Sequence, residues 1–430
     1  MTANNQRMKE RVLGKINQNK DSVVGLCSKV VQVPSENPPG DTRDVAAFLK
    51  DYIERQGFSV RVYDPQKNMP NLVATIGSDK SRNLVLNAHM DVYQADTGAG
   101  AWSVPPFSGL VRDGKIFGRG SSDMKSGLTA LVMTFVRLGE IEKELQGRLT
   151  ITLVSNEEAM GPWGTQWLID NVPEVHANAT LSGEPSAPRA VVIGEKGYLW
   201  LRMKTYGKSA QGSYTALGDN AIVKMAKAVS IADKLSMVSR NVPTELKKAL
   251  GEQKLYWDKY YGKGAGKLLD RITVNTARIS GGKFIGLIPA YCEAELNTRA
   301  PVGTATEYIE KTLRKMLNQA GLSGVEIEVV NKNQPNYTGP KERIVQLMTQ
   351  NVNAIVKDRA LLAVAIGASD QWRFRAKGVP SARYGPAPHS MGGNDEYIYI
   401  KELLNAARVH SATAIDYLTD TNDGTREADN

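Results

Sequence analysis

Strand-like apolar runs alternate with helix-like segments in the first half of this 430-residue chain, and this alternation most constrains its fold. Residues 84–92 (LVLNAHMDV) and 148–155 (RLTITLVS) both have the character of buried strands. A helical pattern lies between them at 126–139 (SGLTALVMTFVRLG), and another precedes them at 42–56. Strands that alternate with helices in this way predict an α/β fold.

The pattern changes near Leu199. Alternating strand patterns such as LWLRMKTY (199–206) are followed by helical patterns at 219–235 and 306–320, together with further strands. One sheet with two helices on a face predicts an α+β sandwich. After residue 333 the first pattern returns, with a last helix predicted from about 400 to 418.

The chain is too long for one ordinary core, so more than one domain is expected. We predict a large domain formed by residues 1–197 and 334–430, interrupted by a small inserted domain at 198–333. The tail from about residue 419 (TDTNDGTREADN) has no apolar periodicity and is predicted to be disordered.

Composition excludes several classes of function. The net charge of +9 comes from lysines and arginines scattered among acidic residues, without a nucleic-acid-binding motif, so we expect no nucleic-acid partner. No apolar run reaches the roughly 18 residues that would span a bilayer, so we expect no membrane association. The only cysteines, Cys27 and Cys292, form no C-x-x-C pair, and the polar N-terminus lacks a signal peptide. A cytoplasmic location is expected.

His89 and Asp91 lie two residues apart at the end of the run 84–92. In a strand, side chains at i and i+2 point to the same face, so both could reach one metal ion. A histidine that is hydrogen-bonded to an aspartate for purely structural reasons is at least as common. The pair alone therefore leaves both interpretations open.

Further acidic and histidine residues also follow predicted strands or lie in glycine-rich loops. They are Asp123 in GRGSSDMKSG, Glu157 and Glu158 in SNEEAMG, Glu184 in LSGEPS, and His389 in YGPAPHSMGGNDEY. Loops at the carboxyl ends of strands form the sites of open α/β sheets. Two of the four histidines, His89 and His389, lie in these loops, whereas His176 is expected at the surface and His410 within a helix. Imidazoles combined with carboxylates suit a pair of zinc-like ions.

These motifs occur in an order and spacing that resemble a known family. NAHMDV, W-x-x-x-PF-x-G from Trp102, DGKIFGRGSSDMKSG, SNEEAMG, SGEPS and the late His389 resemble the co-catalytic metallohydrolases. That family includes acetylornithine deacetylase, succinyl-diaminopimelate desuccinylase, aminoacylase and glutamate carboxypeptidase. The resemblance implies a metallopeptidase-like catalytic domain, interrupted by an α+β sandwich that acts as a lid and pairs subunits into a homodimer or higher homo-oligomer.

The resemblance also implies a ligand set for one or two divalent ions per subunit, which would be zinc, manganese or cobalt. Asp123 resembles the carboxylate that bridges both ions. His89 and Glu184 would complete one site, and Glu158 and His389 the other. The resemblance further implies that the peptide bond after Asp123 is cis.

Other residues would serve catalysis and substrate binding. Glu157 resembles the general base that accepts a proton from the attacking water. Asp91 resembles the carboxylate that orients the imidazole of His89. Arg299 matches a lid arginine that holds a substrate carboxylate, since a planar guanidinium suits carboxylates. The alternative for Arg299 is an ordinary surface arginine.

The sequence departs from the family in the lid. Gln211 stands where relatives have a histidine that reaches across the dimer to the substrate oxygen, and Gly286 stands where many have an asparagine. Gln211 could still donate a hydrogen bond there, so we retain it as a substrate-binding candidate. Both changes remove groups that stabilise negative charge on an amide oxygen.

We therefore expect a metal-dependent hydrolase that cleaves a C–N bond of a small, carboxylate-bearing substrate. The leading expectation is an aromatic aminohydrolase that converts 5-nitroanthranilate to 5-nitrosalicylate plus ammonia, because ring attack moves charge away from the missing lid groups. The alternative is an N-acyl-amino-acid deacylase or exopeptidase. A non-enzymatic relative that only binds a ligand is a third class, which the intact ligand set disfavours.

Overall fold

The computed structural model describes residues 3–78, 81–96, 98, 100–238, 240 and 242–419. These residues form two compact units. The larger unit extends to Ile193 and resumes at Thr338–Ala363 and from Ser369, and the smaller comprises Gly194–Tyr337 and Val364–Ala368. The predicted disordered tail lies outside the described residues, apart from Thr419.

The larger unit is built around a mixed sheet. The mixed sheet contains β1 (Val60–Tyr63), β2 (Asn71–Ile76), β3 (Asn83–His89), β6 (Arg148–Val154), β7 (Ala179–Ser182), β8 (Ala190–Glu195), β14 (Leu361–Ala365) and β15 (Ser381–Arg383). A separate three-stranded sheet contains β4 (Val111–Arg112), β5 (Lys115–Phe117) and β16 (Tyr397–Tyr399). The central strands β6, β3, β7 and β15 are parallel neighbours. Through antiparallel pairs, the order continues to β2 and β1 on one side, and to β8 and then β13 (Asn336–Tyr337) on the other. The predicted α/β class is confirmed.

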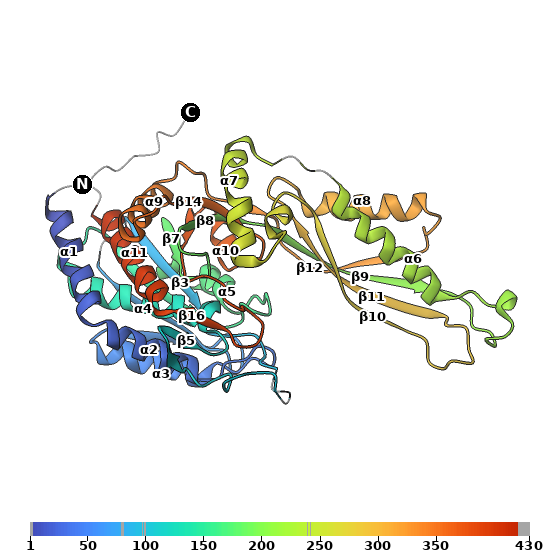
Figure 1. Ribbon diagram of the computed structural model, residues 1–430, viewed down its shortest axis with the longest axis horizontal. Helices are drawn as coiled ribbons and strands as arrows, with labels where there is room; N and C mark the ends of the chain where they lie inside the picture. Colours follow the sequence, from blue (N-terminus) through green and yellow to red (C-terminus); the bar gives the residue numbers. More distant parts are fainter. Residues whose placement is uncertain are drawn as a thin grey trace. The chain divides into compact units, whose positions relative to one another are not determined.

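Helices cover this sheet. They are α1 (Ala3–Gln18), α2 (Lys20–Gln32), α3 (Arg43–Arg55), α4 (Ser126–Gly139), α5 (Thr165–Asn171), α9 (Arg343–Val356), α10 (Gln371–Ala376) and α11 (Ile400–Leu418) (Figure 1). Almost every residue of α4 is buried, because the helix packs against β3, β6 and α11. Among the described residues, no helix is both long and apolar enough to cross a membrane.

The N-terminal helix α1 was not predicted. Its sequence is mostly polar, but Met8, Val12 and Ile16 are buried and recur at intervals of four residues. That spacing places them on one face of the helix, which packs against α11.

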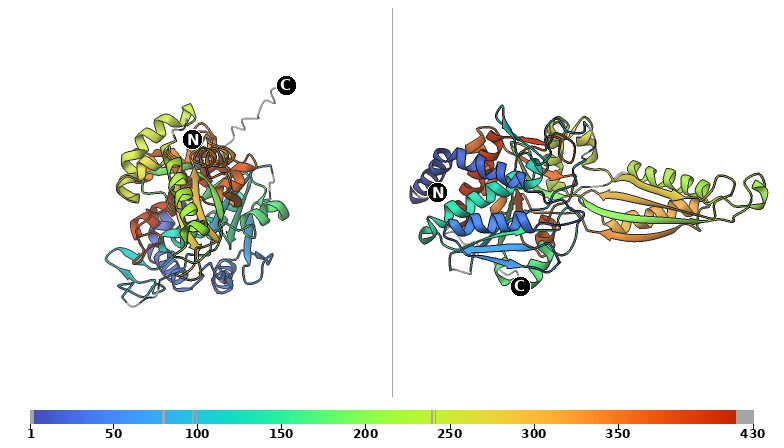
Figure 2. Two further views of the ribbon diagram at one scale, coloured as in Figure 1. Left: turned by 90° about the vertical axis from the view of Figure 1, so that its right-hand side faces the viewer. Right: turned by 90° about the horizontal axis from the view of Figure 1, so that it is seen from below.

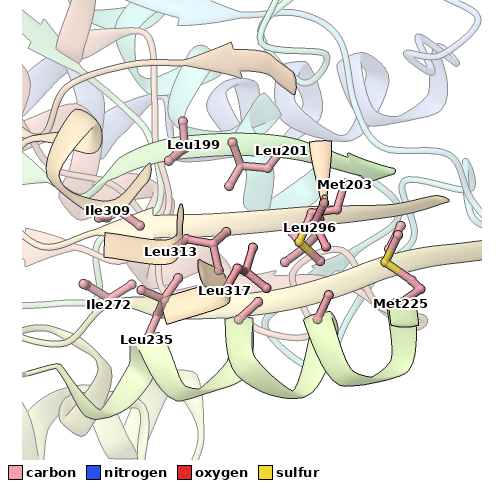
Figure 3. Packing of buried hydrophobic residues seen from close by; sticks show 14 of the residues in the cluster. Leu199, Leu201, Met203, Met225, Leu235, Ile272, Leu296, Ile309, Leu313 and Leu317 are labelled. Atoms are coloured by element: carbon pink, nitrogen blue, oxygen red, sulfur yellow. The ribbon is translucent and has the colours of Figure 1, made fainter. Parts of the chain in front are cut away.

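The smaller unit has a four-stranded antiparallel sheet in the order β10-β11-β9-β12. Its elements are β9 (Gly197–Tyr206), α6 (Ala221–Asp233), α7 (Thr244–Tyr261), β10 (Thr273–Gly281), β11 (Tyr291–Ala300), α8 (Thr306–Gln319), β12 (Glu326–Lys332) and β13 (Asn336–Tyr337) (Figure 2). Leu201 and Leu296 of the sheet pack with Met225 of α6 and Leu313 of α8 (Figure 3). This is the arrangement expected of the inserted α+β sandwich.

Two features of the smaller unit were not predicted. Helix α7 is the first, although Leu246, Leu250 and Trp257 occupy its buried face. The second is the segment Val364–Ala368, which the predicted range of 198–333 omits. Gln253 of α7 explains this attachment, since its side chain both donates to Val364 O (2.6 Å) and accepts from Val364 N (3.0 Å).

Candidate metal centre and active site

The carboxyl ends of three adjacent strands bring candidate ligands to one edge of the large sheet. His89 is the last residue of β3 and pairs with Val154, the last of β6. Glu157 and Glu158 follow β6, and Glu184 follows β7. These strands are parallel neighbours, so their ends lie together.

Asp123 reaches the same place from the segment before α4. Its Oδ1 lies 3.3 Å from His89 Nε2. Glu184 Oε1 is also 3.3 Å from that nitrogen, and Glu157 Oε2 is 3.9 Å away. The peptide bond Asp123–Met124 is cis, as the family resemblance implied.

The ligand atoms form two overlapping groups centred on His89. One group contains His89, Asp123 and Glu158, and the other contains His89, Glu157 and Glu184. Within each group the atoms lie within 4.8 Å of one another. The donor set of an imidazole with several carboxylates is one that zinc-like divalent ions accept.

His89, Glu157, Glu158 and Glu184 are buried and Asp123 is half-buried, so the charges of the cluster interact strongly. Burial and then the neighbouring carboxylates raise the pKa values of Glu157 and Glu158 well above the ordinary value. Burial lowers the pKa of His89, but its hydrogen bonds to Asp123 and Glu184 together with the charges of Glu157 and Glu184 outweigh that effect and raise the pKa. Glu158 Oε1 is buried with no hydrogen-bond partner among the described residues. Crowded carboxylates with a spare oxygen fit a divalent cation, which would balance their charge.

Asp91 lies beside the imidazole of His89. His89 Nδ1 is 2.9 Å from the backbone oxygen of Asp91 and 3.6 Å from its carboxylate. The carboxylate instead accepts hydrogen bonds from Glu158 N (3.0 Å) and Glu157 N (3.3 Å). It also accepts one from Asn37 Nδ2 (2.8 Å). Asp91 therefore contacts the imidazole through both its main chain and its carboxylate, and its carboxylate also holds the loop that carries Glu157 and Glu158.

His389 is not part of either ligand group in the described residues. Its Nε2 lies 3.3 Å from both carboxylate oxygens of Glu402. Its ring stacks on Tyr397 with centroids 4.8 Å apart. Glu402 is therefore the closest acidic partner of His389 in this arrangement.

The two lid candidates belong to the smaller unit. Arg299 lies on β11 opposite Tyr198 of β9, whose ring centroid is 5.8 Å from the guanidinium carbon. Gln211 forms an isolated bridge with Leu287, and the adjacent Gly212 N donates to Gly286 O (2.8 Å). The two positions that depart from the family therefore lie side by side.

Comparison with known proteins agrees with this geometry. Residues 85–416 match the family model described as Peptidase family M20/M25/M40. The chain belongs to this peptidase family. It is therefore a hydrolase of a metal-dependent family that acts on amide and peptide C–N bonds.

Three individual relatives share a quarter or less of their aligned residues with this chain. A probable succinyl-diaminopimelate desuccinylase of Staphylococcus aureus is 25% identical over 408 residues, which cover 92% of this chain and 97% of that protein. The M20 family metallo-carboxypeptidase Sso-CP2 of Sulfolobus solfataricus has the same fold, with a TM-score of 0.76 at 20% identity over 92% of this chain and 98% of that one. The YXEP protein of Bacillus subtilis, a dinuclear metal binding peptidase, has a TM-score of 0.63 at 13% identity over 94% and 99%.

Sequence reasoning missed several residues that contact the site of this M20 family member. Asp370 of the larger unit is among the carboxylates that raise the pKa of Glu157. It accepts from Arg373 Nε (3.1 Å), and Arg373 Nη2 donates to Gly161 O (2.7 Å) in the loop after Glu158. The buried pair of Arg119 and Glu396 was missed as well. The sequence does show charged residues near His389 and Asp123. No local spacing, however, indicates that Arg119 pairs with Glu396.

Proposed function

We propose that this protein is an N-acyl-amino-acid deacylase or exopeptidase that hydrolyses an amide bond in a small substrate with a free carboxylate. The observation that carries the proposal is the cluster of the buried His89, Glu157, Glu158 and Glu184 with the half-buried Asp123. The desuccinylase that matches 92% of this chain supports an acyl substrate.

The site would hold one or two divalent ions, which we propose to be zinc, manganese or cobalt. In this assignment Asp123 is shared, His89 and Glu184 bind one ion, and Glu158 and His389 bind the other. The description of the B. subtilis relative as dinuclear supports two ions. A bound divalent ion supplies Lewis acidity and lowers the pKa of water toward neutrality.

Glu157 would carry the proton. Its carboxylate accepts a proton from the attacking water, whose oxygen forms a bond to the acyl carbon. The carbon–nitrogen bond then breaks, and Glu157 returns the proton to the leaving amine. The products are a carboxylic acid and an amine. Asp91 keeps Glu157 in place through the hydrogen bond it accepts from the Glu157 main chain.

The smaller unit would bind substrate and pair subunits. We propose that Arg299 holds the substrate carboxylate and that Gln211 donates to the substrate oxygen. Its exposed apolar side chains support a homodimer, since Ile285 is 97% exposed and Phe284 is 66% exposed. Sedimentation velocity should give a dimer. A fully active monomer would contradict an active site to which both subunits contribute residues.

The aromatic aminohydrolase remains the second candidate. It rests on Gln211 and Gly286, which lie side by side where relatives have groups for an amide oxygen. The desuccinylase and carboxypeptidase relatives favour the amide substrate instead.

One substrate panel tests both candidates. The metal-loaded protein is incubated with N-succinyl and N-acetyl amino acids, with dipeptides and with 5-nitroanthranilate. Carboxylic acid or free amino acid release and ammonia release are then measured separately. Acyl or peptide cleavage without ammonia from the aromatic amine is the expected result. Ammonia from 5-nitroanthranilate with no amide cleavage would overturn the proposal in favour of the second candidate.

A further inference from the structure

A short strand pair brings the Asp123 segment and the His389 segment together. Strand β5 pairs with β16 in antiparallel register, with Tyr397 opposite Phe117. Gly118 N, just after β5, donates to Glu396 O (2.8 Å), just before β16. Asp123 follows β5 in the sequence, and His389 precedes β16. The strand pair therefore brings both segments close together.

Arg119 joins three segments at this point. Its Nη1 donates to Glu396 Oε2 at 2.6 Å. Its Nη2 donates to Gly392 O (3.2 Å) in the loop after His389, and to Gln94 O (3.3 Å) in the segment after His89 and Asp91. The Arg119 and Glu396 side chains are only 2% and 1% exposed.

Glu396 connects this ion pair to the main chain of Asp123. Its Oε1 accepts hydrogen bonds from Ser122 N (2.8 Å) and Asp123 N (3.2 Å), while Oε2 binds Arg119. The next residue, Tyr397, stacks on the imidazole of His389 with an angle of 7° between the rings. The Glu396 carboxylate thus contacts the main chain of the Asp123 segment directly. The ring of His389 packs on Tyr397, the residue after Glu396.

We propose that Arg119 and Glu396 are positioning residues that hold Asp123 and His389 in the arrangement that binds metal. A buried ion pair contributes little net stability compared with apolar residues of the same volume, because both charges lose hydration. The hydrogen bonds to Ser122 N and Asp123 N give this pair a role that an apolar pair could not fill. The inference rests on the proposed ligand set but not on the proposed substrate.

The test compares Glu396→Gln with a matched control, Asp416→Asn. Asp416 forms another buried ion pair, with Lys9, and also accepts from Asn351 Nδ2 (2.8 Å). These partners lie on α11, α1 and α9, which carry no candidate ligand. Both substitutions preserve shape and remove one buried negative charge, so both should lower the melting temperature of the full-length protein.

Only Glu396→Gln should weaken metal binding. We expect the affinity for Zn²⁺ alone, measured by competition with a chelating dye, to fall about 10- to 100-fold, with kcat reduced more than KM is raised. Asp416→Asn should keep the wild-type Zn²⁺ affinity. Equal Zn²⁺ affinities in both variants would overturn the proposal and leave the pair a purely structural role.

Arg119→Lys provides a second measurement if Glu396→Gln does not fold. It keeps the positive charge but cannot bind Glu396, Gly392 and Gln94 together with one planar group. The expected result is again weaker Zn²⁺ binding, and wild-type affinity would overturn the proposal. Asp123→Ala tests the ligand assignment itself, because unchanged Zn²⁺ binding in this variant would refute it. Weaker binding in Asp123→Ala with wild-type affinity in Arg119→Lys would refute only the positioning role.

Discussion

Glu157 and Glu158 are adjacent in sequence but have different surroundings. The backbone N–H groups of both donate to the Asp91 carboxylate, so one side chain fixes the main chain of both. Glu158 belongs to the ligand group with Asp123, whereas Glu157 belongs to the group with Glu184. Both side chains therefore lie near His89, but each is grouped with a different second carboxylate.

Glu157→Gln tests the proposed base. The amide keeps the shape of the carboxylate but cannot accept the proton, so kcat should fall by about 10² to 10⁴-fold. Metal content and melting temperature should stay close to those of the wild type. Turnover within tenfold of wild type would mean that another group accepts the proton.

His410 gives a prediction for stability at acidic pH. Burial lowers its pKa to about 4, although a hydrogen bond with Tyr384 O (2.6 Å) opposes this. The unfolded chain, with a histidine pKa near 6.5, binds the proton more readily, so stability should fall as the pH drops from about 6.5 to about 4.

His410→Gln should reduce this dependence on pH. Urea unfolding at a series of pH values would show a shallower loss of unfolding free energy than in the wild type. An unaltered profile in His410→Gln would contradict the prediction.

At the scale of elements, two glycines allow α4 to approach the loop that carries Glu184. A Cβ at Gly127, in the first turn of α4, would lie 1.8 Å from Gly183 O. A Cβ at Gly183 would lie 2.5 Å from Gly127 O. Asp123 precedes this turn and Glu184 follows Gly183, so the contact sets the separation between two candidate ligands.

Gly127→Ala should therefore affect both stability and activity. The methyl group must displace backbone, which should cost about 1–3 kcal/mol in unfolding free energy and lower kcat. Gly25→Ala in α2 is the matched control, since no atom lies within 4 Å of its Cβ position. That change should be neutral or stabilise by roughly 0.5–1 kcal/mol. Similar melting temperatures for the two variants would contradict the close contact.

At the scale of the whole molecule, the candidate ligands come from segments that only folding unites. His89, Asp123, Glu158 and Glu184 lie on separate segments of the larger unit. A metal ion held by them binds the folded protein and not the unfolded chain, so it must stabilise the fold.

Chelation should lower the melting temperature and abolish activity. At a free Zn²⁺ concentration of 100 Kd, metal binding adds about 2.7 kcal/mol to the unfolding free energy. Differential scanning calorimetry of chelated and Zn²⁺-reloaded protein would measure the difference. Full activity and an unchanged melting temperature in metal-free protein would refute the metal centre.

The sequence alone determined the features that have a local period. Runs of apolar residues predicted the buried strands at 84–92 and 148–155. The polar residues at the ends of these runs were therefore candidates for a site. Parallel strands then place His89, Glu157 and Glu184 together, because neighbouring parallel strands end at the same edge. The family motifs added Asp123 through its glycine-rich loop.

Only the tertiary structure decided which distant residues meet. Arg119 and Glu396 are 277 positions apart, and no periodicity connects them. The same holds for Gln253 with Val364, and for the Asp91 carboxylate with the main chain of Glu157. Such contacts depend on strand register and on how loops close, whereas a sequence pattern records only which face of its own helix or strand a residue occupies.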